Sequence, residues 1–223
     1  IFILLSVSFG LRGAIEEQFR LFGTDKFFIQ PLGQLGGPGT GGAVQLTQND
    51  LDVVEKISGV KKISSWVSTS GVVKSNDETK FVMVVGADIE AIDLFAESGT
   101  YKAAQGRLLR DKDTADVMLG AHYGTNTFLK KPLEIGQKIT VNEKKFSVIG
   151  ILEPIGNAQD DRLVFIPIEE FRILFEIPER IDMIIIQVDK NENVVDVAKR
   201  TEKKLRSARN VDEDNQDFTI LTP

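Results

Sequence analysis

The chain has 223 residues, of which 42% are hydrophobic and 27% charged, as in an ordinary globular protein. It contains no cysteine, which excludes disulfide scaffolds, thiolate zinc sites, iron–sulfur clusters and cysteine nucleophiles. Its 27 Lys and Arg against 33 Asp and Glu give a net charge of −6, without the basic excess of a nucleic-acid-binding protein. His122 is the sole histidine, so the chain lacks residues that most metallohydrolase and catalytic-triad mechanisms need.

Residues 1–22 combine an apolar start with an amphipathic continuation. No charged residue precedes Arg12, and an apolar stripe at helical spacing follows from Leu11 to Phe22. The apolar run is too short to cross a bilayer, which takes about 20 residues, and it lacks the basic flank of a signal peptide. Since the first residue is Ile1, we expect a piece of a longer protein. Two interpretations stay open: the end of a transmembrane helix followed by a stalk, or a hydrophobic core helix.

The two ends of the remaining chain have related patterns. A strand at 26–31 and a glycine-rich stretch at 33–42 precede a helix that begins at Thr47 with a capping box formed with Asp50. The glycine-rich stretch lacks the Lys-Ser/Thr pair of a phosphate loop and is read as a mobile loop. Two strands follow the helix, and the last quarter reads strand, helix, strand. The order predicts a ferredoxin-like split β-α-β sandwich of the α+β class. These later elements lie at 60–73, 81–85, 181–188, 191–207 and 217–221.

About 90 residues separate the halves of this sandwich, far more than a loop requires. Their pattern predicts a second, mostly β subdomain inserted into the first, with a turn at 142–144 joining two of its strands. The predicted strands lie at 115–120, 137–141, 145–152 and 162–167, and the predicted helices at 89–95, 121–130 and 168–175.

Several short segments, in this order, resemble the periplasmic core domain of MacB-type ABC transporter permeases. The strongest are Gly136–Val141, Phe146–Leu152 and Val164–Pro167. Each segment is degenerate alone, and their order and spacing carry the resemblance over essentially the whole chain. Supporting segments are Val85–Asp88, Gln105–Arg107, Val117–Gly120 and Asp217–Ile220.

The resemblance implies a "porter" subdomain of ferredoxin-like type, interrupted by an inserted "sabre" subdomain. It assigns residues 1–22 to the end of a transmembrane helix and stalk, 23–88 and 179–223 to the porter-type part, and 89–178 to the sabre-type part. It also implies a non-catalytic extracytoplasmic domain that couples ATP-driven helix movement to export or release of a substrate. The implied partners are the membrane, an ABC ATPase subunit or domain, a second permease copy and an adaptor protein. The multidrug-efflux, lipoprotein-releasing, peptide-exporting and peptide-resistance branches all stay open.

From the sequence motifs we expect no catalytic, cofactor-binding or metal-binding residue and no cofactor in this chain. His122 has no second histidine to join it, so we expect a structural role. Asp111, Asp113 and Asp116 resemble the start of a calcium loop without its glycine and distal glutamate. The acidic runs 160–161 and 212–214 read as solvated turns. Two alternative functions remain: a membrane-tethered ligand-binding or adhesion module, and a hydrolase using scattered carboxylates.

Phenylalanine is unusually frequent, with 14 residues against two tyrosines and one tryptophan. Those within predicted elements are expected to lie in the core. Phe95, Phe128 and Phe175 lie near element ends, where an exposed apolar patch would mark a partner or substrate surface. The predicted core set is Phe19, Phe22, Phe27, Phe28, Phe81, Phe146, Phe165, Phe171 and Phe218.

Overall fold

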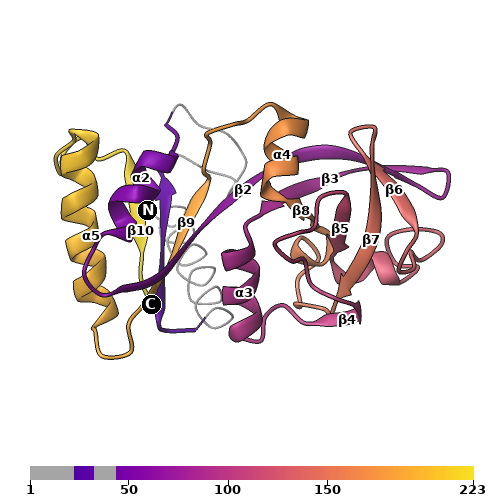
Figure 1. Ribbon diagram of the computed structural model, residues 1–223, viewed down its shortest axis with the longest axis horizontal. Helices are drawn as coiled ribbons and strands as arrows, with labels where there is room; N and C mark the ends of the chain where they lie inside the picture. Colours follow the sequence, from indigo (N-terminus) through magenta and orange to yellow (C-terminus); the bar gives the residue numbers. More distant parts are fainter. Residues whose placement is uncertain (1–22, 33–43) are drawn as a thin grey trace, which may run out of the picture.

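The computed structural model describes residues 23–32 and 44–223 and shows an α+β fold with strands joined in one continuous sheet (Figure 1). The fold class predicted from the sequence is confirmed. The strands are β1 (Lys26–Pro31), β2 (Val60–Ser75), β3 (Glu78–Ala87), β4 (Ala103–Gly106), β5 (Asp116–Leu119), β6 (Lys138–Val141), β7 (Lys144–Leu152), β8 (Val164–Pro167), β9 (Met183–Val188) and β10 (Phe218–Leu221). The helices are α2 (Gln48–Glu55), α3 (Ile89–Glu97), α4 (Ile168–Phe175) and α5 (Val194–Arg209), with short 3-10 helices η1 (Ala121–Gly124) and η2 (Asp160–Arg162).

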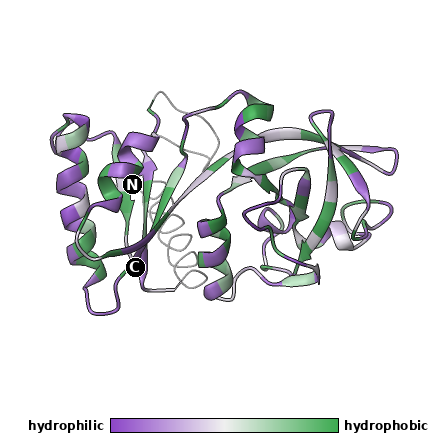
Figure 2. Cartoon of the chain, in the orientation of Figure 1, coloured by the Kyte–Doolittle hydropathy of each residue, from purple (hydrophilic) through white to green (hydrophobic). Residues whose placement is uncertain are grey.

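One end of the molecule is a ferredoxin-like sandwich. Strands β10, β1, β9 and the first half of β2 lie side by side in that order, all antiparallel. Helices α2 and α5 cover one face and bury Phe27, Ile184 and Phe218 with Val54 and Leu205. Figure 2 shows hydrophobic colour on these strands and mostly hydrophilic colour on the outer helix α5. Burial of this stripe, more than helix propensity, holds the two helices on the sheet.

The other end is a closed barrel. Strands β2, β3, β8, β5, β7 and β6 pair in a ring, because β6 pairs with both β7 and the second half of β2. Aliphatic and aromatic side chains fill its interior, including Val73, Val141 and Phe146. Helix α4 packs on β3 and inserts Phe171 into this core. The close approach requires Gly86, where a Cβ would lie 2.8 Å from the Phe171 ring.

Helix α3 lies between the sandwich and the barrel (Figure 1). Its Ile92 and Phe95 join a third cluster formed by the sheet face that α2 and α5 leave uncovered and by outward residues of the barrel. Phe28 and Ile185 come from the sheet, and Phe165 comes from barrel strand β8. The two ends of the molecule are therefore joined by a shared apolar core.

Local sequence signals account for many element ends. The Thr47 amide donates to the Asp50 carboxylate at 2.8 Å, as the predicted capping box requires. The Asn193 side chain caps α5 by accepting from the amides of Val195 and Asp196 at 2.9 and 3.2 Å. Both two-residue hairpin turns, 76–77 and 142–143, have positive φ angles at each position, as a type I′ turn needs.

The structure differs from the sequence predictions in two elements. The helix predicted at 121–130 is only the 3-10 turn η1; the Thr125 hydroxyl donates to the His122 carbonyl at 3.1 Å and so competes with helical pairing of that carbonyl. Strand β4 was not predicted. β3 and the second half of β2 pair with strands of the barrel. If the subdomains are divided by strand pairing, the inserted part begins near Trp66 rather than after residue 88. The subdomain division itself stays a prediction.

The phenylalanine predictions were partly wrong. Phe81 is 77% exposed, because it occupies an outward position of β3, whereas Phe95 is 1% exposed in the shared core. Phe128 and Phe175 are partly buried against the barrel core. The other predicted core phenylalanines in the described part are buried. Phe19 and Phe22 lie outside the described residues, together with the predictions for residues 1–22 and for the glycine-rich stretch 33–42.

In the described ranges, 23–32 and 44–223, no helix is both long and apolar enough to span a membrane.

Candidate functional site: the sheet root and the junction with the barrel

The chain enters and leaves the sandwich at the same corner, which we call the sheet root (residues 23–26 and 221–223). Strands β1 and β10 are antiparallel neighbours, with Phe28 opposite Leu221 and Ile29 opposite Ile220. The start of β1 and the end of β10 therefore lie beside each other, as Figure 1 shows where the C-terminus meets the foot of β1. A displacement at this corner would act on both strands at once.

One arginine holds the far end of β10 to both helices. Arg209, in the last turn of α5, donates to Asp217 through Nε at 2.9 Å and Nη2 at 2.6 Å. Its Nη1 reaches the buried Asp50 carboxylate of α2 at 2.7 Å. The hydrogen bonds from Arg209 lower the pKa of Asp217 below its ordinary range. The guanidinium thus fixes β10, α2 and α5 as one body.

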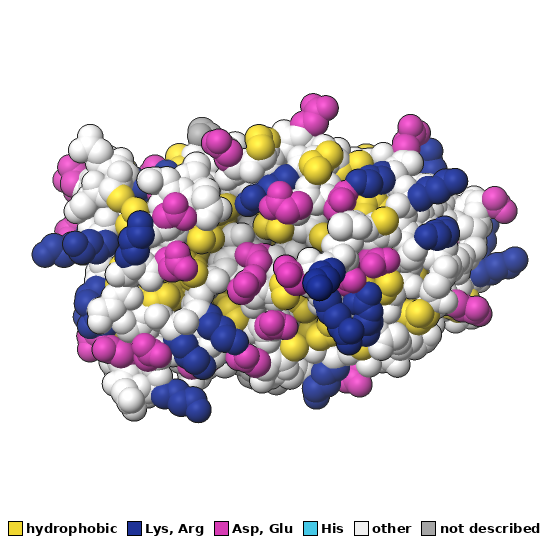
Figure 3. Space-filling model, viewed as in Figure 1, with side chains coloured by type: hydrophobic (Ala, Val, Ile, Leu, Met, Phe, Trp, Pro, Cys, Tyr) yellow, Lys and Arg dark blue, Asp and Glu magenta, His cyan; other side chains and the backbone are white. Residues whose placement is uncertain are grey.

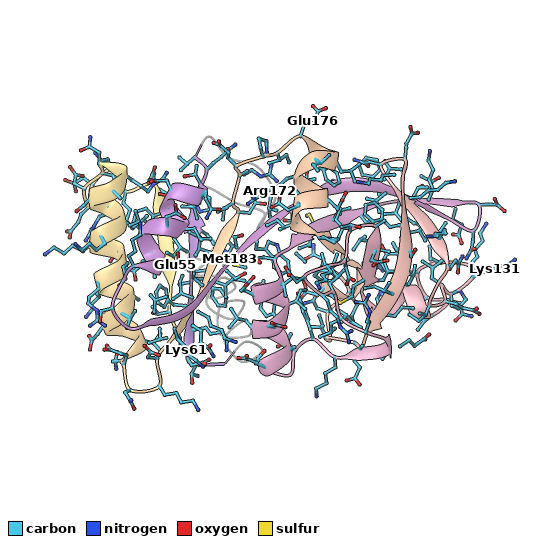
Figure 4. The ribbon with its side chains drawn as sticks, viewed as in Figure 1. Glu55, Lys61, Lys131, Arg172, Glu176 and Met183 are labelled. Atoms are coloured by element: carbon cyan, nitrogen blue, oxygen red, sulfur yellow. The ribbon has the colours of Figure 1, made fainter. Side chains whose placement is uncertain are left out.

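Strand β2 passes from the sandwich into the barrel without a break. Its residues from Val60 to Trp66 pair with β9, and those from Trp66 to Ser75 pair with β3. Trp66 is the point of change, since it lies opposite both Met183 and Ala87. Figure 4 labels Met183 at this crossing, between the sandwich and the barrel. We call this point the junction.

A buried ion pair lies at the junction. Asp182, 1% exposed, accepts the Ser68 amide at 2.8 Å and pairs with Arg180 Nε at 3.0 Å, while its own amide donates to the Trp66 carbonyl at 2.8 Å. Arg180 also donates to the Ser68 carbonyl. Burial raises the pKa of Asp182 and outweighs the lowering by Ser68 and Arg180. These contacts bind the segment before β9 to the middle of β2.

Aromatic rings pack around the same point. The Trp66 ring meets Phe95 of α3 and Phe165 of β8 edge-on, with centroids 5.8 and 6.1 Å apart. Tyr101 contacts both phenylalanines, at 4.8 and 5.4 Å. Edge-to-face pairs of this kind favour a fixed geometry. The junction is therefore a packed, bonded connection.

The acidic cluster that resembled a calcium loop forms an arginine clamp. Arg107 donates to both Asp113 oxygens, at 2.6 and 2.8 Å, and its guanidinium lies 3.9 Å from Asp116. Arg107 lowers the pKa of Asp113, whereas burial raises that of Asp116. Asp111 is exposed and joins no such contact in the described part of the chain. The cluster anchors a loop.

The other acidic runs form turns. The buried Asp161 carboxylate accepts the Ile155 amide at 2.7 Å, and Asp160 accepts the Asn157 side chain. Asp212 accepts two amides of its own turn, at 3.0 and 3.2 Å. Over the described ranges, no group of three or more His, Asp or Glu side chains could hold a metal ion, and His122 lies on η1 away from any such group. The structure brings none of these residues together as a reactive centre.

Sequence reasoning missed the junction residues Arg180 and Asp182. A signal was present, because Asp182 is a charged residue at the head of the apolar run Ile181–Val188. A carboxylate in such a run needs a buried partner. The partner residue Ser68 lies 114 positions away, so the pairing itself could not be read from the sequence.

These features define a type of fold: a ferredoxin-like sandwich with the start of β1 and the end of β10 at one corner and a barrel continued from one of its strands. A model of the MacB-like periplasmic core domain matches residues 1–204, and the chain belongs to this family. It is thus an extracytoplasmic domain of the kind found in MacB-like ABC transporter permeases.

A relative and two solved structures agree with this assignment. An uncharacterized ABC transporter permease of Methanocaldococcus jannaschii, MJ1507, is 28% identical over 221 residues, which cover 98% of this chain and 53% of that protein. The chain therefore spans about half the length of this curated relative. The periplasmic region of MacB from Actinobacillus actinomycetemcomitans has a TM-score of 0.72 at 20% identity, over 94% of each chain. The extracellular domain of the noncanonic ABC-type transporter YknZ from Gram-positive bacteria has a TM-score of 0.66 at 13% identity, over 88% of this chain and all of that chain.

Proposed function

We propose that this domain is a mechanical coupler in an ABC transporter permease: it carries ATP-driven movement of membrane helices to the export or release of a substrate and performs no catalysis itself. ATP hydrolysis would reside on a separate nucleotide-binding subunit or domain. The domain would act beside a second permease copy on the extracytoplasmic side, held to the membrane through residues 1–22, with an adaptor protein as a further partner.

One observation carries this proposal: the sandwich that contains the sheet root continues into the barrel through one unbroken strand, β2. Movement applied to β1 and β10 reaches β9 and then β2 through hydrogen-bonded neighbours. The ion pair of Arg180 and Asp182 and the packing of Trp66 oppose bending where β2 enters the barrel.

The test uses the full-length permease with its ATPase in lipid nanodiscs, with spin labels at one exposed position per copy. Lys131, at the far end of the barrel (Figure 4), reports on the barrel, and Lys204 of α5 reports on the sandwich. This chain has no cysteine, so each labelling cysteine is unique within it. Distances between the two copies are compared in the nucleotide-free and ATP–vanadate states.

We expect the distances at both positions to change with nucleotide. Asp182→Ala should reduce the change at Lys131 while leaving that at Lys204, because the junction lies between them. Asp113→Ala, which breaks an ion pair away from the junction, is the control and should preserve both changes. If the distance between the Lys131 positions of the two copies is the same in the nucleotide-free and ATP–vanadate states, the coupling is refuted. That result would favour the tethered ligand-binding or adhesion module.

A further inference from the structure

The sandwich ends in a strand whose outer side is open. β10 is the last strand of the sheet, and within the described ranges it pairs with β1 alone. Next to this pair, the Leu32 amide donates to the Asp217 carbonyl at 2.8 Å. Backbone groups alternate in direction along a strand, so those of Thr219 also point to β1, whereas those of Phe218 and Ile220 point outward. These outward groups form an open pairing edge.

The sequence of β10 leaves this edge unprotected. Its four residues, Phe-Thr-Ile-Leu, include no charged residue and no proline, which natural proteins commonly place on exposed edges. The Gln216 side chain reaches the edge and donates to the outward Phe218 carbonyl at 2.9 Å. A carbonyl oxygen has two lone pairs, so it can still accept a second donor. Within the described ranges, the outward groups of Ile220 have no partner.

A hollow beside the edge leaves space for another strand. It has a volume of about 550 Å³ and is lined by residues of β10 and α5 and by Leu32, which is 53% exposed. Ile220 and Leu221 are only partly buried, and they belong to the apolar clusters on opposite faces of the sheet. An added strand would therefore cover apolar surface on both faces, which favours association.

The charges around the hollow suit a second copy of the same chain. The lining contains Glu202 and Arg206 of α5 and Glu213 of the following loop, and Arg206 pairs with Glu213 at 3.2 Å. A strongly acidic or basic partner would meet its own sign here, whereas two mixed linings can exchange ion pairs across a two-fold axis. Figure 3 shows Lys and Arg side chains interspersed with Asp and Glu at the sandwich end of the viewed face.

We propose that β10 pairs with β10 of a second copy, antiparallel and with Thr219 at the two-fold axis, so that the two sandwiches share one sheet. In this register Phe218 lies opposite Ile220 of the second copy, and their outward N–H and C=O groups bond each other. So short a ladder would hold a free peptide weakly, but two copies in one membrane assembly meet at a high effective concentration. The inference rests on the second permease copy of the proposed function and adds where the copies meet.

Cysteine crosslinking in the full-length permease tests the register, with any cysteine outside this chain replaced by serine. Directly opposite residues without mutual hydrogen bonds have Cα atoms about 4.5 Å apart, within reach of a disulfide bond. Thr219→Cys should therefore give a covalent dimer on oxidation. The controls are Ile220→Cys, which would lie diagonally from its counterpart, and Lys131→Cys, at the far end of the barrel (Figure 4).

We expect at least five times more dimer from Thr219→Cys than from either control, in the nucleotide-free state, the ATP–vanadate state or both. Yields that equal the controls in both states would overturn the proposal.

A backbone variant tests the hydrogen bonds themselves. Proline at position 220 removes an N–H that points outward and none that bonds β1, and edge strands tolerate proline. Ile220→Val keeps the N–H and is the matched control. With Thr219→Cys present, Ile220→Pro should lower the dimer yield at least fivefold, and Ile220→Val should stay within twofold. Equal yields would refute the strand ladder. If Ile220→Pro does not assemble, the comparison of Thr219→Cys with Ile220→Cys still decides the register.

The number of copies separates this inference from the proposed function. Mass photometry of the permease and its ATPase in nanodiscs measures that number. A single permease copy would refute both this pairing and the second copy of the proposed function. Two copies without a Thr219→Cys dimer would refute only the pairing of β10, and the distances at Lys131 would still test the coupling.

Discussion

Removing the buried carboxylate at the junction tests whether the two ends of the molecule are held together there. Asp182→Ala leaves Arg180, whose side chain is 15% exposed, without its counter-charge and leaves the Ser68 amide without its acceptor. Deleting one partner of a buried ion pair typically costs about 3–5 kcal/mol. We expect the free energy of unfolding of the 223-residue chain to fall by that amount.

The assay is urea denaturation followed by tryptophan fluorescence. Trp66 is the only tryptophan, and it lies at the junction against Phe95 and Phe165, so its emission reports on this point. The comparison variant is Asp113→Ala, which breaks a bidentate ion pair with Arg107; because the Arg107 side chain is 35% exposed and water can replace its partner, the loss should be smaller, about 1–2 kcal/mol.

A compensating double variant separates the cost of leaving a charge unpaired from the cost of the cavity left by a smaller side chain. In R180M/D182N the amide oxygen still accepts from Ser68, and no charge remains unpaired, so the variant should be markedly more stable than Asp182→Ala. Replacement of a whole buried pair is often near neutral. If Asp182→Ala lies within about 1 kcal/mol of the unmodified chain, the junction is not held by this pair and our reasoning fails.

Three further outcomes follow from the same contacts, each measured by urea denaturation. Because Arg209 lowers the pKa of Asp217, the stability lost in Asp217→Asn should be largest above roughly pH 4 and shrink as pH falls below it; a constant difference would contradict this. Gly86→Val should cost at least about 1–3 kcal/mol, since its Cβ would press on Phe171; a neutral effect would show that α4 can move away. Phe81→Ser should stay within about 0.5 kcal/mol, and a larger loss would mean that this ring packs in the fold.

The sequence was most informative where a local rule decides the structure. The Thr47 and Asp50 capping pair and the turn at 142–143 need only neighbouring residues, and the structure has both. Residues 121–130 were predicted to form a helix, yet the Thr125 hydroxyl competes for the His122 carbonyl, to which it donates at 3.1 Å. Periodicity does not include that competition, so the prediction failed there.

Features that depend on contacts between residues distant in the sequence could not be predicted from such local rules. Phe81 reads like its buried neighbours in β3, and only the closure of the barrel decides which alternate positions face outward. The ring closes through Val73 and Val141, residues from distant parts of the chain. The ion pair at the junction depends equally on contacts between β2 and the segment before β9. The sequence predicted both ends of the molecule, but not how they meet.

How they meet decides whether the barrel can follow the sandwich. An insertion attached through two loops could swing freely, but here the chain enters the barrel inside a strand of 16 residues, roughly 50 Å long at the usual rise. It returns through a segment bonded both to the sandwich and to the barrel half of β2: Ile181 bridges Leu46, and Asp182 bonds Ser68. Bending at Trp66 would break ladder hydrogen bonds and separate packed aromatic rings, so in the proposed function a tilt imposed at the sheet root would be carried into the barrel.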